Sequence, residues 1–185
     1  MEARPARTVA GDGLCLSAAE LRALNVYYTA PRPVYLMGVA LGDRTNLFPM
    51  DLVGRVGSGD YLLALRATSR PIELIEATRV IAMSPAPAEH YALVYALGAH
   101  HRTPSVDLSS LPFSVQRSSL HRLPVSAQGL TRELSVTDVH RVGSYNLFVC
   151  RVDAESGTTT RALALVSAMY AEWLARHGHP LETLA

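Results

Sequence analysis

Residues 64–75, ALRATSRPIELI, lead from an apolar strand through a polar turn into a short helix. The strand is predicted over Tyr61–Ala67, an apolar run rich in residues that favour strands. A helix is predicted over Pro71–Ala77, where the missing N–H of proline costs nothing in the first turn. The turn between them contains Arg66, Thr68, Ser69 and Arg70.

The composition of this turn is typical of an anion site. A helix N-terminus offers unpaired backbone N–H groups and the positive end of its dipole. Guanidinium and hydroxyl groups add charge-assisted hydrogen bonds that suit a phosphate. The alternative is a purely structural turn, because arginine, serine and threonine are common in soluble turns and helix caps. The residues therefore favour a phosphorylated ligand and leave the structural turn open.

Further strands are expected on both sides of this junction, over residues 34–41, 46–53, 79–83, 134–140 and 145–153. Pro49 cannot donate a ladder hydrogen bond, so its strand should be an edge strand or contain a bulge. The glycine-rich residues 54–59 lie between two predicted strands and favour a hairpin loop over a phosphate cradle.

Three more helices are expected. Ser17 and Glu20 have capping-box spacing ahead of a short helix, and others are predicted over Ala88–Leu97 and Arg161–His177. Residues 1–16 are expected to be loosely held, and residues 98–130 to form a long, partly ordered loop. Since the strands are not separated by regular crossover helices, the order predicts a closed or partly closed antiparallel barrel with peripheral helices, in one domain over residues 1–185.

Composition excludes several classes of function. The 185 residues carry a net charge of +1, and the 17 basic residues are all arginines scattered along the chain, so nucleic acid is not an expected partner. No apolar run has the length of a signal sequence or membrane span, so a soluble cytoplasmic protein without membrane contact is expected. Cys15 and Cys150 are expected to be reduced and structural. The pairs His100-His101 and His177/His179 lie in polar segments expected to be exposed, and no metal site is predicted.

Three blocks together resemble the flavin reductase-like, FMN-binding split-barrel family: PRPVYLMGVALGDRTNLFPMDL (31–52), YLLALRATSRPIELIEATRVIAMS (61–84) and VGSYNLFVCRV (142–152). The family has an asparagine shortly after a turn in the first block, where Asn46 stands here. Its second block is similar to A-x-R-x-x-S-x-T-x-x-L-I, which is matched by Ala64, Arg66, Ser69, Leu74 and Ile75. Its third is similar to G-x-H-x-L-F-x-G-x-V, which is matched by Gly143, Leu147, Phe148 and Val152.

The resemblance implies a mainly β fold, a six-stranded antiparallel split barrel that forms a homodimer with FMN at the interface. It places the phosphate on Arg66 and Ser69, assisted by Thr68 and Arg70. It places the flavin ring along a segment that contains Asn46, Pro49, Met50, Asp51 and Leu52. NAD(P)H is the implied co-substrate.

The chain departs from the family pattern at three places. Pro71 stands where a phosphate-binding threonine is usual, and Pro49-Met50-Asp51 replaces a Thr-x-Ser segment. An ionised Asp51 close to the flavin would disfavour the anionic reduced form and lower the reduction potential. Tyr145 replaces a histidine associated with nicotinamide or substrate binding, and is the expected substrate-binding residue.

Three hypotheses follow from these residues. The first is an oxidoreductase that passes electrons from NAD(P)H through FMN to free flavin or another small acceptor. The second is an FMN-binding module for storage, sensing or electron transfer without efficient nicotinamide chemistry. The third is a degenerate barrel that acts as an interaction protein. No catalytic acid or base is assigned, because the cofactor would carry the chemistry.

Overall fold

The computed structural model describes residues 17–57, 59–161 and 163–166, and individually residues 169, 172, 176 and 178. Two compact units are present, residues 32–165 and a unit that combines residues 1–31 with 166–185. The predicted loosely held residues 1–16, and Cys15 with them, lie outside the described residues. The expectation of a single domain stays a prediction.

Helix α1, Ala18–Thr29, belongs to the second unit and begins as its sequence predicts. The Ser17 hydroxyl accepts from the Glu20 backbone N–H at 3.2 Å, and the Glu20 carboxylate accepts from the Ser17 N–H at 2.7 Å. This reciprocal capping box satisfies two N–H groups at the helix start. None of the helices in the described part of the chain combines the length and apolar character needed to cross a membrane.

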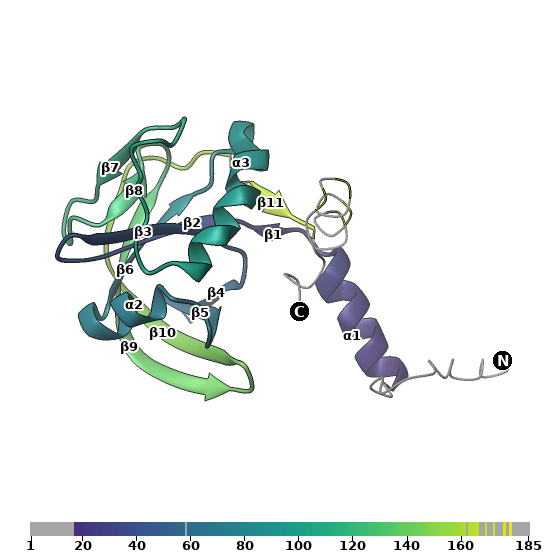
Figure 1. Ribbon diagram of the computed structural model, residues 1–185. Helices are drawn as coiled ribbons and strands as arrows, with labels where there is room; N and C mark the ends of the chain where they lie inside the picture. Colours follow the sequence, from purple (N-terminus) through teal and green to yellow (C-terminus); the bar gives the residue numbers. More distant parts are fainter. Residues whose placement is uncertain are drawn as a thin grey trace, which may run out of the picture. The chain divides into compact units, whose positions relative to one another are not determined.

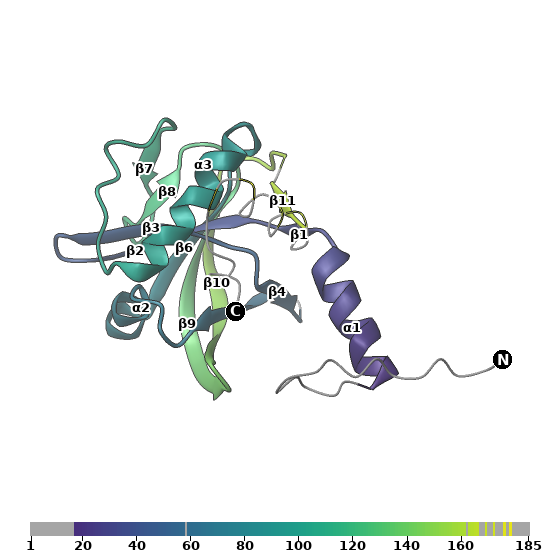
Figure 2. The same cartoon turned by 45° about the vertical axis from the view of Figure 1, so that its right-hand side comes forward.

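The unit of residues 32–165 is built on a curled antiparallel sheet with strand order β3-β2-β6-β9-β10-β5-β4 (Figures 1 and 2). Its strands are β2 (Tyr35–Leu41), β3 (Arg44–Met50), β4 (Val53–Val56), β5 (Asp60–Arg66), β6 (Val80–Pro85), β9 (Thr131–Val142) and β10 (Tyr145–Ser156). The mainly β, split-barrel fold is confirmed. The sheet has seven strands rather than the six expected, because the short β4 pairs with β5 at one edge.

Two small ribbons accompany the sheet. One pairs β1 (Arg32–Pro33) with β11 (Ala164–Leu165), and the other pairs β7 (Val115–Arg117) with β8 (Pro124–Ser126). The predicted helix over 161–177 is therefore wrong at its start, where β11 is held by pairing with β1. Most of the remainder of that prediction lies outside the described residues. The expected long loop over 98–130 contains β7 and β8.

The helical segments between strands are short. They are α2 (Ile72–Thr78), η1 (Ala88–His90), α3 (Tyr91–Ala96) and η2 (Leu97–Arg102), of which η1 and η2 are 3-10 helices. Helix α2 follows the predicted junction, with Pro71 as its N-cap residue. Because β5 and β6 lie apart in the sheet, the segment that contains α2 must cross from one to the other.

The main core lies between the curled sheet and α2. Alternate residues of β5 point into it, and α2 adds Ile72, Leu74 and Ile75, of which Leu74 and Ile75 are fully buried. Cys150 belongs to this core and is a free, buried cysteine, and burial raises the pKa of its thiol to about 12. The expectation of a reduced structural thiol at Cys150 agrees with this position.

Strand β3 stands at the sheet edge, as Pro49 predicts. Its outer edge is covered by η2 and the residues that follow it. The Val106 N–H donates to the Thr45 carbonyl at 2.8 Å, and the Thr45 N–H donates to the Ser105 hydroxyl at 3.2 Å. Covering an edge in this way removes a template for pairing with other chains.

Strand β8 packs against the outer face of β2 at a glycine. A β-carbon on Gly38 would lie 1.7 Å from the Pro124 carbonyl oxygen. Beside this close approach, Leu123 and Val125 pack with Ala82 of β6 in a small apolar cluster. A side chain at position 38 would therefore separate the β7–β8 ribbon from the sheet.

Gly38→Ala should lower the free energy of unfolding by about 1–3 kcal/mol, because the new methyl group meets backbone atoms and not a movable side chain. Urea denaturation measures the change. Gly54→Ala is the matched control, since a β-carbon there meets no described atom within 4 Å. Equal stability of the two variants would contradict the close packing at Gly38.

Candidate functional site

The turn after β5 is held mainly by its own backbone. The Ser69 N–H donates to the Arg66 carbonyl at 2.8 Å, and the Arg70 N–H donates to the His101 carbonyl at 2.9 Å. The Ile72 N–H donates to the Ser69 carbonyl at 3.2 Å. The expectation of unpaired N–H groups is therefore wrong at these three positions, because tight turns and η2 supply their acceptors.

Unlike these three backbone N–H groups, which are hydrogen-bonded, two side chains of the turn are exposed. Thr68 and Arg70 are exposed, and Arg66 is half-buried as the last residue of β5. The Arg70 guanidinium lies 3.1 Å from the Glu73 carboxylate, and both side chains are about half exposed. An exposed pair of this kind is weak and readily rearranged. The turn thus presents two guanidinium groups and a hydroxyl that a phosphate could engage.

Ser69 differs from the rest of the turn because it is buried and contacts a histidine. Its exposed fraction is 8%, and its Oγ lies 3.3 Å from Nδ1 of His101. Nε2 of the same ring lies 3.0 Å from the Pro49 carbonyl oxygen. A carbonyl can only accept, so Nε2 carries the hydrogen, and in the neutral ring Nδ1 accepts from the Ser69 hydroxyl. His101 therefore connects the predicted phosphate turn to the predicted flavin-ring segment.

The environment of His101 favours the neutral ring. Burial lowers its pKa most, the hydrogen bond to Pro49 raises it, and the net shift is downward. Its ring also makes an edge contact with Phe48, with centroids 4.8 Å apart. His101 is consequently expected to be uncharged at neutral pH.

Asn46 attaches η2 to β3. Its side chain is fully buried, and its Nδ2 donates to the carbonyls of His100 at 3.1 Å and Thr103 at 2.7 Å. The Nδ1 of His100 lies 2.6 Å from the Leu47 carbonyl oxygen. Both histidines are half-buried, so the expectation that this pair is exposed is wrong. Their ring nitrogens contact carbonyl oxygens of β3, on the edge that η2 covers.

Asn46→Ala should destabilise the fold by about 1–2 kcal/mol, because the carbonyls of His100 in η2 and of Thr103, its C-cap residue, lose their donor. We expect faster proteolysis between residues 97 and 106 than elsewhere. Asn146→Ala, on β10, is the matched asparagine control. Unchanged cleavage in the Asn46 variant would contradict its role in holding η2.

In the rest of the segment predicted to line the flavin ring, one side chain is buried in the core and another forms an ion pair. Met50 is buried, and the Leu52 carbonyl accepts from the Ala64 N–H at 3.1 Å. Asp51 Oδ2 accepts from Arg32 Nε at 2.9 Å and Nη2 at 2.6 Å. The Arg32 guanidinium offsets the carboxylate charge that was expected to act on a nearby flavin.

Tyr145 lies beside the phosphate turn. It is the first residue of β10 and pairs with Arg66 of β5. The preceding residue, Ser144, accepts at its carbonyl from the Ala67 N–H at 2.8 Å. The structure thus brings Tyr145 and the turn together, although 78 positions separate Tyr145 from Ala67 in the sequence.

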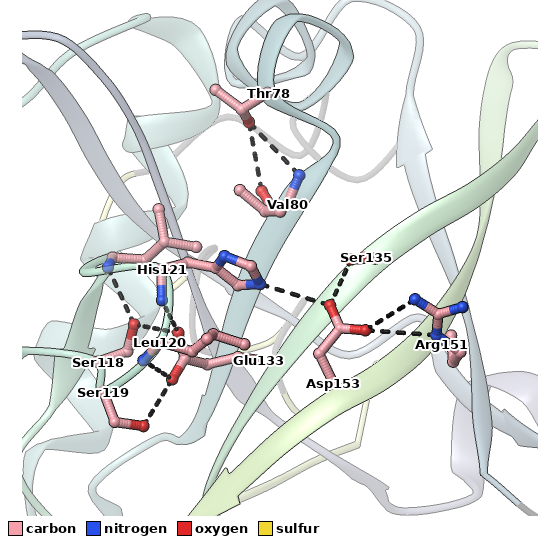
Figure 3. A network of polar contacts seen from close by, with 11 residues as sticks. Thr78, Val80, Ser118, Ser119, Leu120, His121, Glu133, Ser135, Arg151 and Asp153 are labelled. Atoms are coloured by element: carbon pink, nitrogen blue, oxygen red, sulfur yellow. Dashed lines mark hydrogen bonds and ion pairs between the residues drawn. The ribbon is translucent and has the colours of Figure 1, made fainter.

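A second polar cluster, which the sequence did not indicate, holds the loop between β7 and β8 (Figure 3). Glu133 of β9 is 1% exposed. Its Oε2 accepts from the Ser118 hydroxyl and the His121 N–H, both at 2.6 Å. Its Oε1 accepts from the Ser119 hydroxyl at 2.9 Å and the Leu120 N–H at 2.8 Å. The carboxylate therefore closes the loop onto the sheet.

The same loop makes one contact with an acidic side chain of β10. His121 Nε2 lies 3.4 Å from Asp153 Oδ2, and Asp153 also accepts from Ser135 and Arg151 (Figure 3). No group of three or more histidine, cysteine, aspartate or glutamate side chains in the described part of the chain could hold a metal ion. The geometry of this cluster is that of a structural anchor.

The fold is similar to those of several solved proteins, among them an FMN-binding protein and flavin reductases. The FMN-binding protein from Thermus thermophilus, solved with bound 1-cyclohex-2-enone, is 22% identical, with a TM-score of 0.61 over 81% of this chain and 79% of that one. BorF, the flavin reductase component of a bacterial two-component tryptophan halogenase, is 15% identical, with a TM-score of 0.67 over 80% and 94%. The styrene monooxygenase flavin reductase from Pseudomonas putida S12 is 16% identical, with a TM-score of 0.60 over 80% and 93%. No protein-family model and no curated protein matches the sequence.

Proposed function

We propose that this chain, which has a flavin reductase-like, FMN-binding split-barrel fold, is an FMN-binding oxidoreductase. The observation that carries the proposal is the turn after β5, where Arg66, Thr68 and Arg70 lie together in a fold shared with FMN-binding proteins. Two guanidinium groups and a hydroxyl suit a phosphate monoester, which carries close to two negative charges at neutral pH.

The residues of the turn fit the phosphate unequally. Arg66 and Arg70 would bind it through charge-assisted hydrogen bonds, and Arg70 would exchange its exposed contact with Glu73 for the ligand. Thr68 would add a hydroxyl in place of the threonine that Pro71 replaces. Ser69 could donate only by releasing His101.

The flavin ring would lie along the segment from Asn46 to Leu52. Pro49, Met50, Asp51 and Leu52 would contribute backbone and apolar contacts there, with Asp51 held by Arg32. Asn46 would act by fixing η2 against this segment. Tyr145 would approach the nicotinamide or substrate from the start of β10, next to the phosphate turn.

Bound FMN would accept a hydride from NAD(P)H and pass electrons to free flavin or another small acceptor. The protein's contribution is to bind and orient the cofactor, which requires no acid or base of its own. We include in the proposal a homodimer, with the cofactor at its interface, and a cytoplasmic location where nicotinamide reductants are available.

An FMN-binding module without efficient nicotinamide chemistry is the second candidate. One observation that favours it is that His101 already contacts the Pro49 carbonyl oxygen and the Ser69 hydroxyl, two groups of the proposed site. The other is that Tyr145 stands where the family has a histidine associated with nicotinamide binding. A degenerate barrel that serves as an interaction protein would follow if FMN did not bind.

Steady-state oxidation of NADH and NADPH with added FMN separates these functions. The oxidoreductase should increase the rate above that of free flavin at the same concentration, with saturation in the nicotinamide. FMN binding without such turnover would favour the binding module and contradict the enzyme proposal.

A further inference from the structure

His101 is a titratable side chain that the proposed flavin chemistry does not use, yet it lies between two parts of the proposed site. Its Nδ1 faces Ser69 Oγ at 3.3 Å, and its Nε2 faces the Pro49 carbonyl at 3.0 Å. The edge contact with Phe48 further restricts the ring. Both nitrogens therefore have fixed partners.

The donor and acceptor roles in this chain of contacts are determined. The Pro49 carbonyl requires a hydrogen on Nε2, so in the neutral ring Nδ1 has a lone pair that accepts from Ser69. While His101 is neutral, the single hydroxyl hydrogen of Ser69 is directed to the histidine. It cannot also be donated to a ligand.

We propose that binding of the FMN phosphate at the turn is coupled to uptake of one proton by Nδ1 of His101. When Ser69 donates its hydrogen to a phosphate oxygen, the lone pairs of Nδ1 and Oγ are left facing each other. A proton from solvent on Nδ1 restores this contact, with Oγ now as acceptor. The inference deepens the proposed function, since it requires FMN to bind at Arg66, Thr68, Ser69 and Arg70.

The charges around His101 give the sign of this coupling. Burial and the nearby His100 and Arg66 lower its pKa, whereas Asp51 and the Pro49 carbonyl raise it. Arg70, on the same turn, bonds the His101 carbonyl through its N–H. A bound phosphate adds negative charge and stabilises the imidazolium. FMN affinity should therefore rise as the pH falls between the two pKa values of His101, in the free and the bound protein.

Isothermal titration calorimetry tests the coupling. FMN would be titrated into the whole protein at pH 7.5 in two buffers of different ionisation enthalpy, and the difference in heat gives the number of protons exchanged. We expect net uptake of up to one proton per FMN bound. Phosphate monoesters have a second pKa of about 6, so free FMN is mostly dianionic at this pH. Binding of the dianion could release protons from the ligand but not take them up, so a measured uptake would come from the protein.

Three controls isolate His101. Riboflavin, which lacks the phosphate, should bind without proton uptake. His101→Gln keeps an amide donor for Pro49 but cannot titrate, so FMN should bind it with no uptake. His100→Gln removes a neighbouring histidine whose Nδ1 contacts Leu47 instead of Ser69, and it should keep the uptake.

The outcomes separate this inference from the proposed function. FMN binding without uptake, or with the same uptake in His101→Gln, would overturn the coupling and leave the FMN proposal intact. Absence of binding to both FMN and riboflavin would overturn both. If His101→Gln does not fold, NMR of the wild-type histidine rings provides the test, with His101 assigned through Phe48. An unchanged His101 pKa on FMN addition would contradict the coupling.

Discussion

Glu133→Ala should lower the free energy of unfolding by about 3–5 kcal/mol, because the backbone N–H groups of Leu120 and His121 lose a buried charged acceptor, at a typical cost of about 1–3 kcal/mol each. It also removes the partner of the Ser118 and Ser119 hydroxyls. Urea denaturation at pH 7 measures the change. We expect the loop of residues 118–123 to become sensitive to proteases in parallel.

Glu155→Ala is the matched control for this effect. Glu155 is an exposed glutamate on β10 that pairs with Arg132, and an exposed pair contributes about 0–1 kcal/mol. Similar losses in the two variants would contradict the anchoring role of Glu133.

The effect of Glu133 should depend on pH. Burial alone would raise its pKa, but the hydrogen bonds from Ser118, His121, Leu120 and Ser119 together hold the pKa below its ordinary value. A carboxylate with a lowered folded-state pKa stabilises the fold above its unfolded pKa, about 4.3, and loses this contribution as the pH falls through the folded value. The stability difference between the wild type and Glu133→Ala should therefore be full at pH 7 and shrink in acid below pH 4. A stability difference that stays constant between pH 7 and acid would contradict the lowered pKa of Glu133.

Arg66→Ala should reduce FMN affinity at least tenfold, since a charge-assisted hydrogen bond contributes about 1.5–3 kcal/mol and about 1.4 kcal/mol corresponds to a factor of ten. Quenching of flavin fluorescence gives the affinity. Arg117→Ala, an exposed arginine on β7, is the control and should bind FMN as the wild type does.

Riboflavin distinguishes the phosphate contact from a general loss of structure. Its affinity should change little in Arg66→Ala, because it has no phosphate to lose. Unchanged FMN affinity in this variant would contradict the placement of the phosphate on the turn after β5.

The strands of the main sheet were predictable because their signals are local. Apolar runs bounded by glycine, proline or polar residues indicated β2, β5, β6, β9 and β10, and Pro49 indicated that β3 lies at an edge. The two-residue strand β11 was missed because it depends on pairing with β1, more than 130 positions earlier. Local pattern cannot report such a pairing.

The residues of the candidate site were predictable from the sequence, but the contacts among them were not. The turn with Arg66 and Ser69 was evident from one segment, whereas His101 reaches Ser69 and Pro49 across 32 and 52 positions. A single contact between residues far apart in the sequence produces no periodic pattern. For the same reason, the sequence did not indicate the Arg32–Asp51 pair or the four donors of Glu133.

The most direct test of the FMN proposal is the visible absorption spectrum of the freshly purified protein, followed by denaturation, identification of any released chromophore, and titration with added FMN. We expect a flavin spectrum and released FMN, or stoichiometric uptake of FMN by colourless protein. A colourless protein that does not take up FMN would contradict FMN binding and leave the fold without its proposed cofactor.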